Sequence, residues 1–471
     1  MRLLERETAT AALAGYAAEA RRGAGRLVLV GGEAGIGKSA LLEQCERDLP
    51  QARWSWGACD GLSTPRPLGP LFDVAEQLGG TLLELSRAGA GRDELFRGLL
   101  REVGDPDTLD VVVVEDVHWA DEATLDLVRF LGRRLHRAAV LLLVTYRSDG
   151  LAASDPLRVA LGDLAAQRSA RRIDLAPLSA RAVHVLAGGS AADAATLHRL
   201  TGGNPFYVAE VVRSGTPGVP GSARDAVLAR AARLSPAARE VLDTAALTGS
   251  RVESRLLESV VPCPSPVMDE LIASSLVIWD DSRLRFRHEI ARLAIEGAVS
   301  FHRSRGIHAM VLATLDAQGC DDDARMAFHA EAAADPPAVV RHATAAARRA
   351  AWLASHREAA AQYRRALRFA ADADADAATL AELYEGLAEE AALLDQWQDA
   401  AEACERALLE WRVAGDRLRE GDTLRRLSRI SWNMCHGETV AAEAAVAVLE
   451  PLGPGVELAW AYATLANQKM L

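Results

Sequence analysis

One stretch decides the fold of this chain of 471 residues: Gly32-Glu33-Ala34-Gly35-Ile36-Gly37-Lys38-Ser39. An apolar segment at 26–30 precedes it, and a helical pattern at 40–49 follows it. A glycine-rich turn between a strand and a helix points backbone N–H groups into one concavity, to which the helix N-terminus adds positive potential. The spacing is that of a phosphate-binding loop. The sequence therefore predicts a nucleotide site formed by these eight residues and Ala40.

Lysine usage supports this interpretation. The chain has 53 basic residues, and its only two lysines are Lys38 and Lys469. A compact ammonium group reaches between two phosphates, which a planar guanidinium does poorly. We expect Lys38 to bridge the β- and γ-phosphates of ATP and the Ser39 hydroxyl to ligate Mg²⁺.

An acidic pair, Glu115 and Asp116, follows the apolar run 111–114. In P-loop sites one carboxylate at such a strand end holds Mg²⁺, usually through water, while the next orients or deprotonates the attacking water. The sequence leaves open which of the two does which. The first position is more often Asp, and the longer Glu115 predicts slow hydrolysis.

Four further residues have both a functional and a structural interpretation. His118 and Trp119 either shape the γ-phosphate pocket or simply pack. Asp121 is best explained as the cap of the helix that follows. Arg147 follows the apolar run 140–144 after Thr145 and Tyr146, at the same sheet edge as the phosphates, so it is either a γ-phosphate sensor or a surface arginine.

The order of patterns predicts several modules. Short apolar runs alternate with helical patterns over 1–175, which indicates a P-loop core with a parallel sheet covered by helices. A helical lid follows at 176–213, where Asn204 caps a helix and Pro205 suits its first turn. Residues 214–222 break all periodicity and form a linker. A winged-helix-like module with a hairpin, 276–279 and 284–286, occupies 223–300.

Alanine-rich helices fill 301–471. Residues 357–367 resemble residues 398–408 at an offset of 41, with small residues and a closing Ala-Leu. Stacked helix pairs use such residues for close packing, so we expect a repeat array, although any two alanine-rich helices look alike. The chain ends just after a further helical stretch with no polar capping repeat, as in an incomplete array.

Composition restricts the partners. A formal charge of -12 opposes broad attraction to nucleic acid or anionic membranes. The six cysteines are scattered without a C-x-x-C pair, which indicates neither zinc nor disulfides and fits a reducing cytoplasm. No targeting signal or membrane-spanning segment is expected.

Six motifs together resemble one family. The chain is similar to the N-terminal and middle parts of the large ATP-binding regulators of the LuxR type, within the STAND class of signal-transduction ATPases. The motifs occur in the family's order over nearly the whole chain: Leu4-Glu5-Arg6-Glu7, the phosphate loop, Glu115-Asp116-Val117-His118-Trp119-Ala120-Asp121, Thr145-Tyr146-Arg147, Gly202-Gly203-Asn204-Pro205-Phe206 and Phe286-Arg287-His288-Glu289.

The resemblance implies an AAA-like core, a helical lid, a winged-helix-like module and tetratricopeptide-like repeats. It also implies a switch that is closed with ADP, and that opens and self-associates with ATP and an inducer. By the same likeness Asn204 and Pro205 lie over the nucleotide, Arg147 is a sensor, and Arg6 lies near the adenine. The family's C-terminal helix-turn-helix is missing, so we expect no specific DNA binding by this chain alone.

Other classes of function remain open. A stand-alone scaffold or sensor would use the same ATP site without DNA. A phosphotransferase would need a second substrate site, which the sequence does not reveal. A replication-initiator-like ATPase would need a basic stripe, and the acidic balance opposes one. A structural protein with an inactive nucleotide pocket is the fourth possibility.

Overall fold

A computed structural model of the chain describes residues 3–61, 64–149, 155–188, 191–214, 223–280, 283–434 and 439–470. Of the predicted linker at 214–222, only Ser214 belongs to the described residues. Cys435 and most of the predicted hairpin turn also lie outside them. The chain divides into two compact units, Met1–Gly319 and Cys320–Leu471. Each unit is described by itself.

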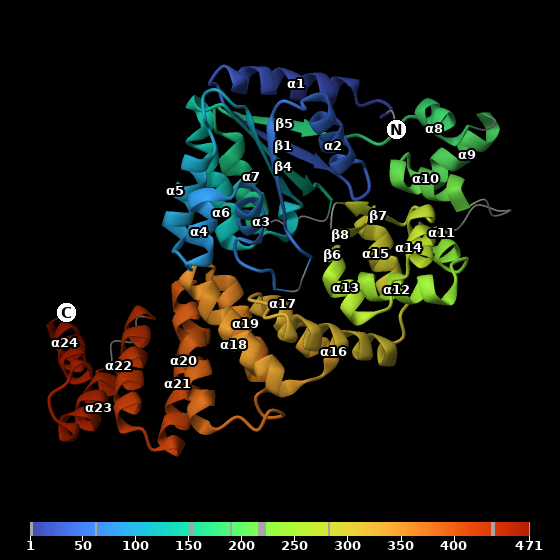
Figure 1. The fold of residues 1–471 in the computed structure, drawn as a ribbon. Helices are drawn as coiled ribbons and strands as arrows, with labels where there is room; N and C mark the ends of the chain where they lie inside the picture. The colour runs from blue at the N-terminus through green and yellow to red at the C-terminus, as the bar shows by residue number, and fades with distance from the viewer. Residues whose placement is uncertain are drawn as a thin grey trace. The chain divides into compact units, whose positions relative to one another are not determined.

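The first unit is built on a parallel five-stranded sheet with the strand order β2-β3-β4-β1-β5 (Figure 1). Three strands confirm the predicted apolar runs: β1 (Arg26–Gly32), β3 (Asp110–Glu115) and β4 (Val140–Arg147). They are central and almost entirely buried, which explains their continuous apolar sequence. The edge strands β2 (Arg53–Ala58) and β5 (Ala170–Asp174) were not predicted, because their polar residues interrupt the apolar pattern.

Helices cover this sheet, as predicted for a P-loop fold. Leu13 of α1 (Glu7–Arg21) and Leu41 of α2 (Lys38–Asp48) pack on one face of the central strands in a single core cluster. The further helices of the P-loop core are α3 (Gly69–Leu78), α4 (Gly80–Arg87), α5 (Arg92–Glu102), η1 (Val117–Trp119), α6 (Glu122–Gly132), η2 (Leu135–Arg137) and α7 (Pro156–Ala165). Because all strands are parallel, their carboxyl ends lie at one edge, where functional residues are expected.

A helical segment and a small mixed module complete the first unit. The helices are α8 (Ala180–Ala187), α9 (Ala191–Thr201), α10 (Pro205–Ser214), α11 (Ala223–Ala231), α12 (Pro236–Thr248), α13 (Ser254–Val260), α14 (Ser265–Ala273), α15 (Glu289–Glu296) and α16 (Phe301–Ala317). The predicted hairpin is confirmed as β7 (Val277–Asp280) and β8 (Arg283–Phe286), antiparallel to each other. A strand that was not predicted, β6 (Arg251–Glu253), pairs with the other side of β8.

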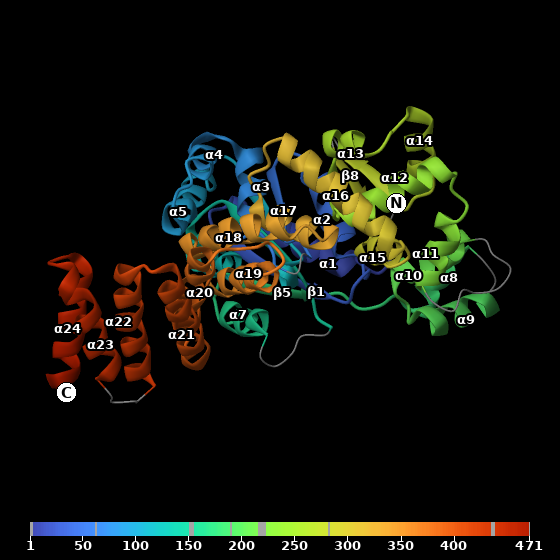
Figure 2. The same cartoon turned by 90° about the horizontal axis from the view of Figure 1, so that it is seen from below.

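The second unit is all helical. It contains α17 (Asp323–Ala333), α18 (Pro336–Trp352), α19 (His356–Phe369), α20 (Ala377–Leu393), α21 (Trp397–Ala414), α22 (Arg417–Asn433), α23 (Val440–Leu449), η3 (Glu450–Leu452) and α24 (Val456–Met470), and successive helices pack on one another (Figure 2). The pair α20 and α21 begins 41 residues after the pair α18 and α19, from 336 to 377 and from 356 to 397. The predicted offset is therefore a structural repeat.

Two findings on apolar helices and on cysteines hold for the described residues. No helix among them is long and apolar enough to cross a membrane. The five cysteines within the described ranges are all free, and Cys45, Cys59 and Cys404 are buried.

Candidate functional site

The loop between β1 and α2 takes a path that only glycine adopts easily. Gly35 and Gly37 have φ values of 76° and 97°. A Cβ on Gly35 would lie 2.9 Å from Cβ of Phe206, so the loop passes close to α10. The first bond of the helix runs from the Leu41 amide to the Gly37 carbonyl, and the amides before Leu41 have no intrahelical acceptor. This loop has the backbone of an anion site.

Lys38 is the buried cation of the loop, with 8% of its surface exposed. Its Nζ donates to the carbonyl oxygens of Gly32 at 2.9 Å and Glu33 at 3.0 Å. Burial lowers its pKa, an effect that the charge of Asp116 opposes. These bonds hold the ammonium group against the loop, close to the amides that would bind phosphate.

The carboxylate of Glu115 connects three elements. Its Oε1 accepts a hydrogen bond of 2.6 Å from the Ser39 hydroxyl, and its Oε2 lies 2.5 Å from the guanidinium of Arg251. Ser39 belongs to α2, Glu115 ends β3, and Arg251 begins β6 of the small sheet. Both oxygens of this carboxylate therefore have partners.

Asp116 lies beside Glu115 in a left-handed conformation with φ 56°. Its amide donates to the hydroxyl of Thr145 on β4 at 2.8 Å. Burial, followed by the charge of Glu115, raises its pKa to about 6. A carboxylate with a pKa near neutrality is suited to proton transfer at physiological pH.

His118 belongs to the same buried edge. Burial lowers its pKa to about 3, and the charges of Arg147 and Lys38 contribute. The ring is therefore neutral at pH 7, and its Nδ1 lies 3.7 Å from Oδ1 of Asp116. Asp121 caps α6 by accepting from the Thr124 amide at 3.0 Å, which confirms the capping interpretation.

Arg147 ends β4, which lies between β1 and β3 in the sheet. It is therefore placed between the phosphate loop and the acidic pair, opposite Gly32 in the parallel register. Its guanidinium lies 5.8 Å from the ring centre of Trp119. Trp119 thus packs against the sensor candidate.

Residues from outside the sheet hold the phosphate loop. Nδ2 of Asn204 donates to the Ala34 carbonyl at 2.8 Å, while its Oδ1 accepts from the Phe206 amide at 3.1 Å and caps α10. From the N-terminal segment, Arg6 donates to the Ile36 carbonyl at 3.1 Å and to the Ala176 carbonyl at 2.9 Å. The loop is therefore fixed from two sides.

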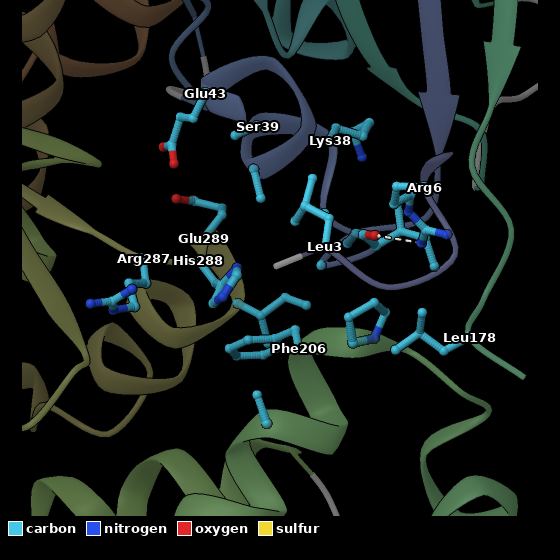
Figure 3. A pocket seen from close by; sticks show the side chains of 18 of the residues that line it. Leu3, Arg6, Lys38, Ser39, Glu43, Leu178, Phe206, Arg287, His288 and Glu289 are labelled. Atoms are coloured by element: carbon cyan, nitrogen blue, oxygen red, sulfur yellow. Dashed lines mark hydrogen bonds between the residues drawn. The ribbon is translucent and has the colours of Figure 1, made fainter. Parts of the chain in front are cut away.

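An open pocket of about 260 Å³ lies among these parts (Figure 3). Lys38 and Ser39 lie on one side, Leu178 and Phe206 on another, and His288 with Glu289 on a third. Among the residues predicted for the site, those that line the cavity are Arg6, Ala34, Gly35, Ile36, Gly37, Lys38, Ser39, Ala40, Asp116, Arg147 and Pro205. Gly32, Glu33, Glu115 and Asn204 do not line it, but they contact residues that do.

Several residues of the site were not predicted. Arg251 and the ion pair of Arg285 with Glu43, at 2.8 Å, come from the small sheet and α2. Apolar side chains of Leu3 and Leu178 line the cavity. The alternation Arg-Leu-Arg-Phe in β8 was a signal for a strand with one charged face, but the sequence does not show which carboxylates that face meets.

The donor set fits a nucleotide with magnesium. The amides of a glycine turn, a buried ammonium group and a helix N-terminus suit phosphates. A hydroxyl and two carboxylates at one edge are the oxygen ligands that Mg²⁺ prefers. In the described part of the chain, no group of three His, Cys, Asp or Glu side chains could hold a metal, so protein side chains of these types do not form a separate metal cage.

Comparison with known proteins agrees with the fold. Residues 2–144 match the model of the AAA ATPase domain family. An uncharacterized protein of Rhizobium meliloti (strain 1021) is 29% identical over 303 residues, which cover 51% of this chain and 29% of that protein. The chain thus spans less than a third of this relative.

Solved structures with a similar arrangement are distant. One is a signal transduction ATPase with numerous domains (STAND) and a tetratricopeptide repeat sensor from Pyrococcus horikoshii, with a TM-score of 0.46 at 13% identity, covering 99% of this chain and 80% of that one. Another is Cdc6p from Pyrobaculum aerophilum, with a TM-score of 0.36 at 14% identity, covering 67% and 95%. We draw no functional conclusion from either likeness. The fold is that of a P-loop NTPase followed by an all-helical array, and its first part matches an AAA ATPase domain.

Proposed function

We propose that this chain is an ATP-binding signal-transduction switch that hydrolyses ATP slowly to ADP and phosphate. The observation that carries this proposal is the 2.6 Å bond between Ser39 and Glu115, which joins the phosphate loop to the acidic strand end. These are the two parts that an Mg²⁺-dependent P-loop ATPase needs side by side. The match of residues 2–144 to an AAA ATPase domain supports the same class.

In this proposal the chain's own groups divide the work. The amides of residues 32–40 and the Lys38 ammonium group bind phosphate oxygens. Ser39, Glu115 and Asp116 would hold Mg²⁺, which supplies charge neutralisation when bound. With its pKa raised to about 6, Asp116 accepts a proton from the attacking water, and Glu115 orients that water. Arg147 responds to the γ-phosphate, while Asn204 and Pro205 cover the nucleotide from α10.

The biological setting is a further part of the proposal. The order of motifs is similar to that of LuxR-type regulators of the STAND class, and this similarity supports a role as their regulatory and sensor part. The helical unit would act as tetratricopeptide-like repeats that bind an inducer or a protein partner. ATP would favour self-association, and DNA binding would need a domain beyond these residues. We place the protein in the cytoplasm and keep the five predicted modules as its functional parts.

The test begins with nucleotide binding. Titration calorimetry with ATP and Mg²⁺ should give measurable affinity for the wild type and a loss of about 10- to 100-fold for Lys38→Ala, since a charge-assisted bond contributes about 1.5–3 kcal/mol. Lys469→Ala is the matched control, because the other lysine is 57% exposed on α24. Single-turnover hydrolysis should then be slow in the wild type and absent in Glu115→Gln. An affinity that Lys38→Ala leaves unchanged would disprove the proposal.

A further inference from the structure

The small sheet β6-β8-β7 has two unlike faces. Along β8 the residues alternate, so that Leu284 and Phe286 are buried in the helical core while Arg283 and Arg285 point the other way. Arg251 of β6 stands directly opposite Arg285 in the register and shares its face. We call Arg251, Arg283 and Arg285 the arginine face.

The arginine face would destabilise an isolated small sheet, because its charges repel one another. Like charges directly opposite each other on neighbouring strands destabilise the pair. Arg251 and Arg285 are such a pair, so their placement calls for carboxylates outside the sheet that compensate the repulsion. The arginine face is therefore suited to docking against an acidic surface.

Carboxylates of the P-loop core meet all three arginines. Arg251 pairs with Glu115 at 2.5 Å, Arg285 with Glu43 of α2 at 2.8 Å, and Arg283 with Glu76 of α3 at 4.0 Å. Figure 3 shows Glu43 on the helix that follows the phosphate loop. Glu115 is the most buried of these carboxylates, with 7% of its side chain exposed against 36% and 68% for the other two. The strongest contact of the face is thus made with the carboxylate of the nucleotide site.

We propose that the arginine face is an electrostatic latch that restrains ATP turnover. Arg251 holds Glu115 through Oε2, and Ser39 holds Oε1, so the carboxylate that would orient water is fixed toward the small sheet. Turnover then requires the arginine face to separate from the core. The inference rests on the proposed function, since it assigns a regulator to that same site.

The latch has two contacts that mutation can separate. Arg251→Ala removes the charge that holds Glu115, whereas Glu43→Arg opposes Arg285 with a like charge and leaves Glu115 untouched. The charge swap Glu43→Arg with Arg285→Glu restores attraction. Arg255→Ala is the matched control, because Arg255 is an exposed arginine of the same module on α13.

Single-turnover hydrolysis at saturating ATP and Mg²⁺ is the first measurement. Arg251→Ala and Glu43→Arg should each raise the rate about tenfold, as expected when a charge pair largely removed from water is lost. Arg255→Ala should stay within about threefold of the wild type, which is small beside that change. The charge swap should lower the rate again relative to Glu43→Arg alone, because attraction between the two positions is restored. An unchanged or reduced rate in Arg251→Ala, or a charge swap that fails to restore restraint, would overturn the latch.

A second measurement does not depend on hydrolysis. Fluorophores on encoded azide residues that replace Asp107 and Glu258, both exposed, report the distance between core and module. Glu43→Arg should lengthen this distance, and the charge swap should return it. If the protein did not bind ATP but the distance still changed in the variants as expected, the proposed function would be refuted and the docking contact would be retained. Normal ATP binding with no response in distance would refute the latch alone.

Discussion

Asn204 offers the sharpest test of how the helical segment supports the phosphate loop. One side-chain amide does two things, since Nδ2 donates to the Ala34 carbonyl at 2.8 Å and Oδ1 accepts from the Phe206 amide at 3.1 Å. The residue is buried, with 4% of its surface exposed, so water does not easily replace either bond. Replacing it therefore changes the loop, the start of α10, or both.

Two substitutions separate these roles. Asn204→Ser keeps a good cap for α10 but cannot reach the loop carbonyl, whereas Asn204→Ala loses both bonds. A net hydrogen bond contributes about 1 kcal/mol, and so does an N-cap side chain. Each loss should therefore change an equilibrium constant about fivefold.

Nucleotide affinity reports the loop, and hydrogen exchange of residues 206–212 reports the cap. We expect ATP affinity to fall about fivefold in both variants, because a loop without this bond must be ordered on binding. Exchange in α10 should be about fivefold faster in Asn204→Ala and unchanged in Asn204→Ser. Wild-type affinity in Asn204→Ser would refute the loop role, and equal exchange in the two variants would refute the cap role.

Three further outcomes are expected. Gly35→Ala should lower ATP affinity by more than about tenfold, because φ is 76° and the new Cβ would lie 2.9 Å from Cβ of Phe206; calorimetry measures the loss, and wild-type affinity would contradict the steric argument. The pKa of Asp116 is raised from 3.8 to about 6, so its contribution to stability is full below about pH 4 and is lost as pH rises through 6. Asp116→Asn should therefore be more stable than the wild type above pH 6, with no difference at pH 3.5. We expect a gain of about 1 kcal/mol, because 39% of the Asp116 side chain is exposed and solvent screens much of the effect. Denaturation of the nucleotide-free protein measures this gain, and a gain independent of pH would contradict the argument. Gly386→Ala should destabilise the helical unit by about 1–3 kcal/mol, because its Cβ would lie 2.3 Å from Cζ of Tyr363. ATP affinity should not change. Calorimetric melting measures the loss of stability, and titration calorimetry measures the affinity.

The sequence predicted what local patterns determine. A phosphate loop is eight consecutive residues, and β1, β3 and β4 are continuous apolar runs because both of their faces are buried. Strand β2 was missed because it lies at the sheet edge, where Arg53 is exposed, and because the buried Ser55 interrupts its apolar pattern. The hairpin β7-β8 was predicted from two short runs, 276–279 and 284–286, on either side of a turn, whereas β6 has only three residues and carries no pattern of its own.

Contacts between segments that are distant in the sequence could not be predicted from local patterns. Arg251 meets Glu115 across 136 residues of sequence, and Arg285 meets Glu43 across 242. Nothing in the residue types distinguishes these arginines from the many others that replace lysine in this chain. The like-charge register of Arg251 and Arg285 becomes visible only once β6 is known to pair with β8.

Glu115 links the nucleotide site to the small sheet in both directions. Because its two oxygens are held by Ser39 and Arg251, any ligand that draws Ser39 or Glu115 toward itself weakens the contact with the arginine face. Thermodynamic linkage makes the effect reciprocal, so a partner that pulls the small sheet away must change nucleotide affinity by the same factor. In the proposed switch, the carboxylate that orients water would therefore also couple the nucleotide site to the arginine face.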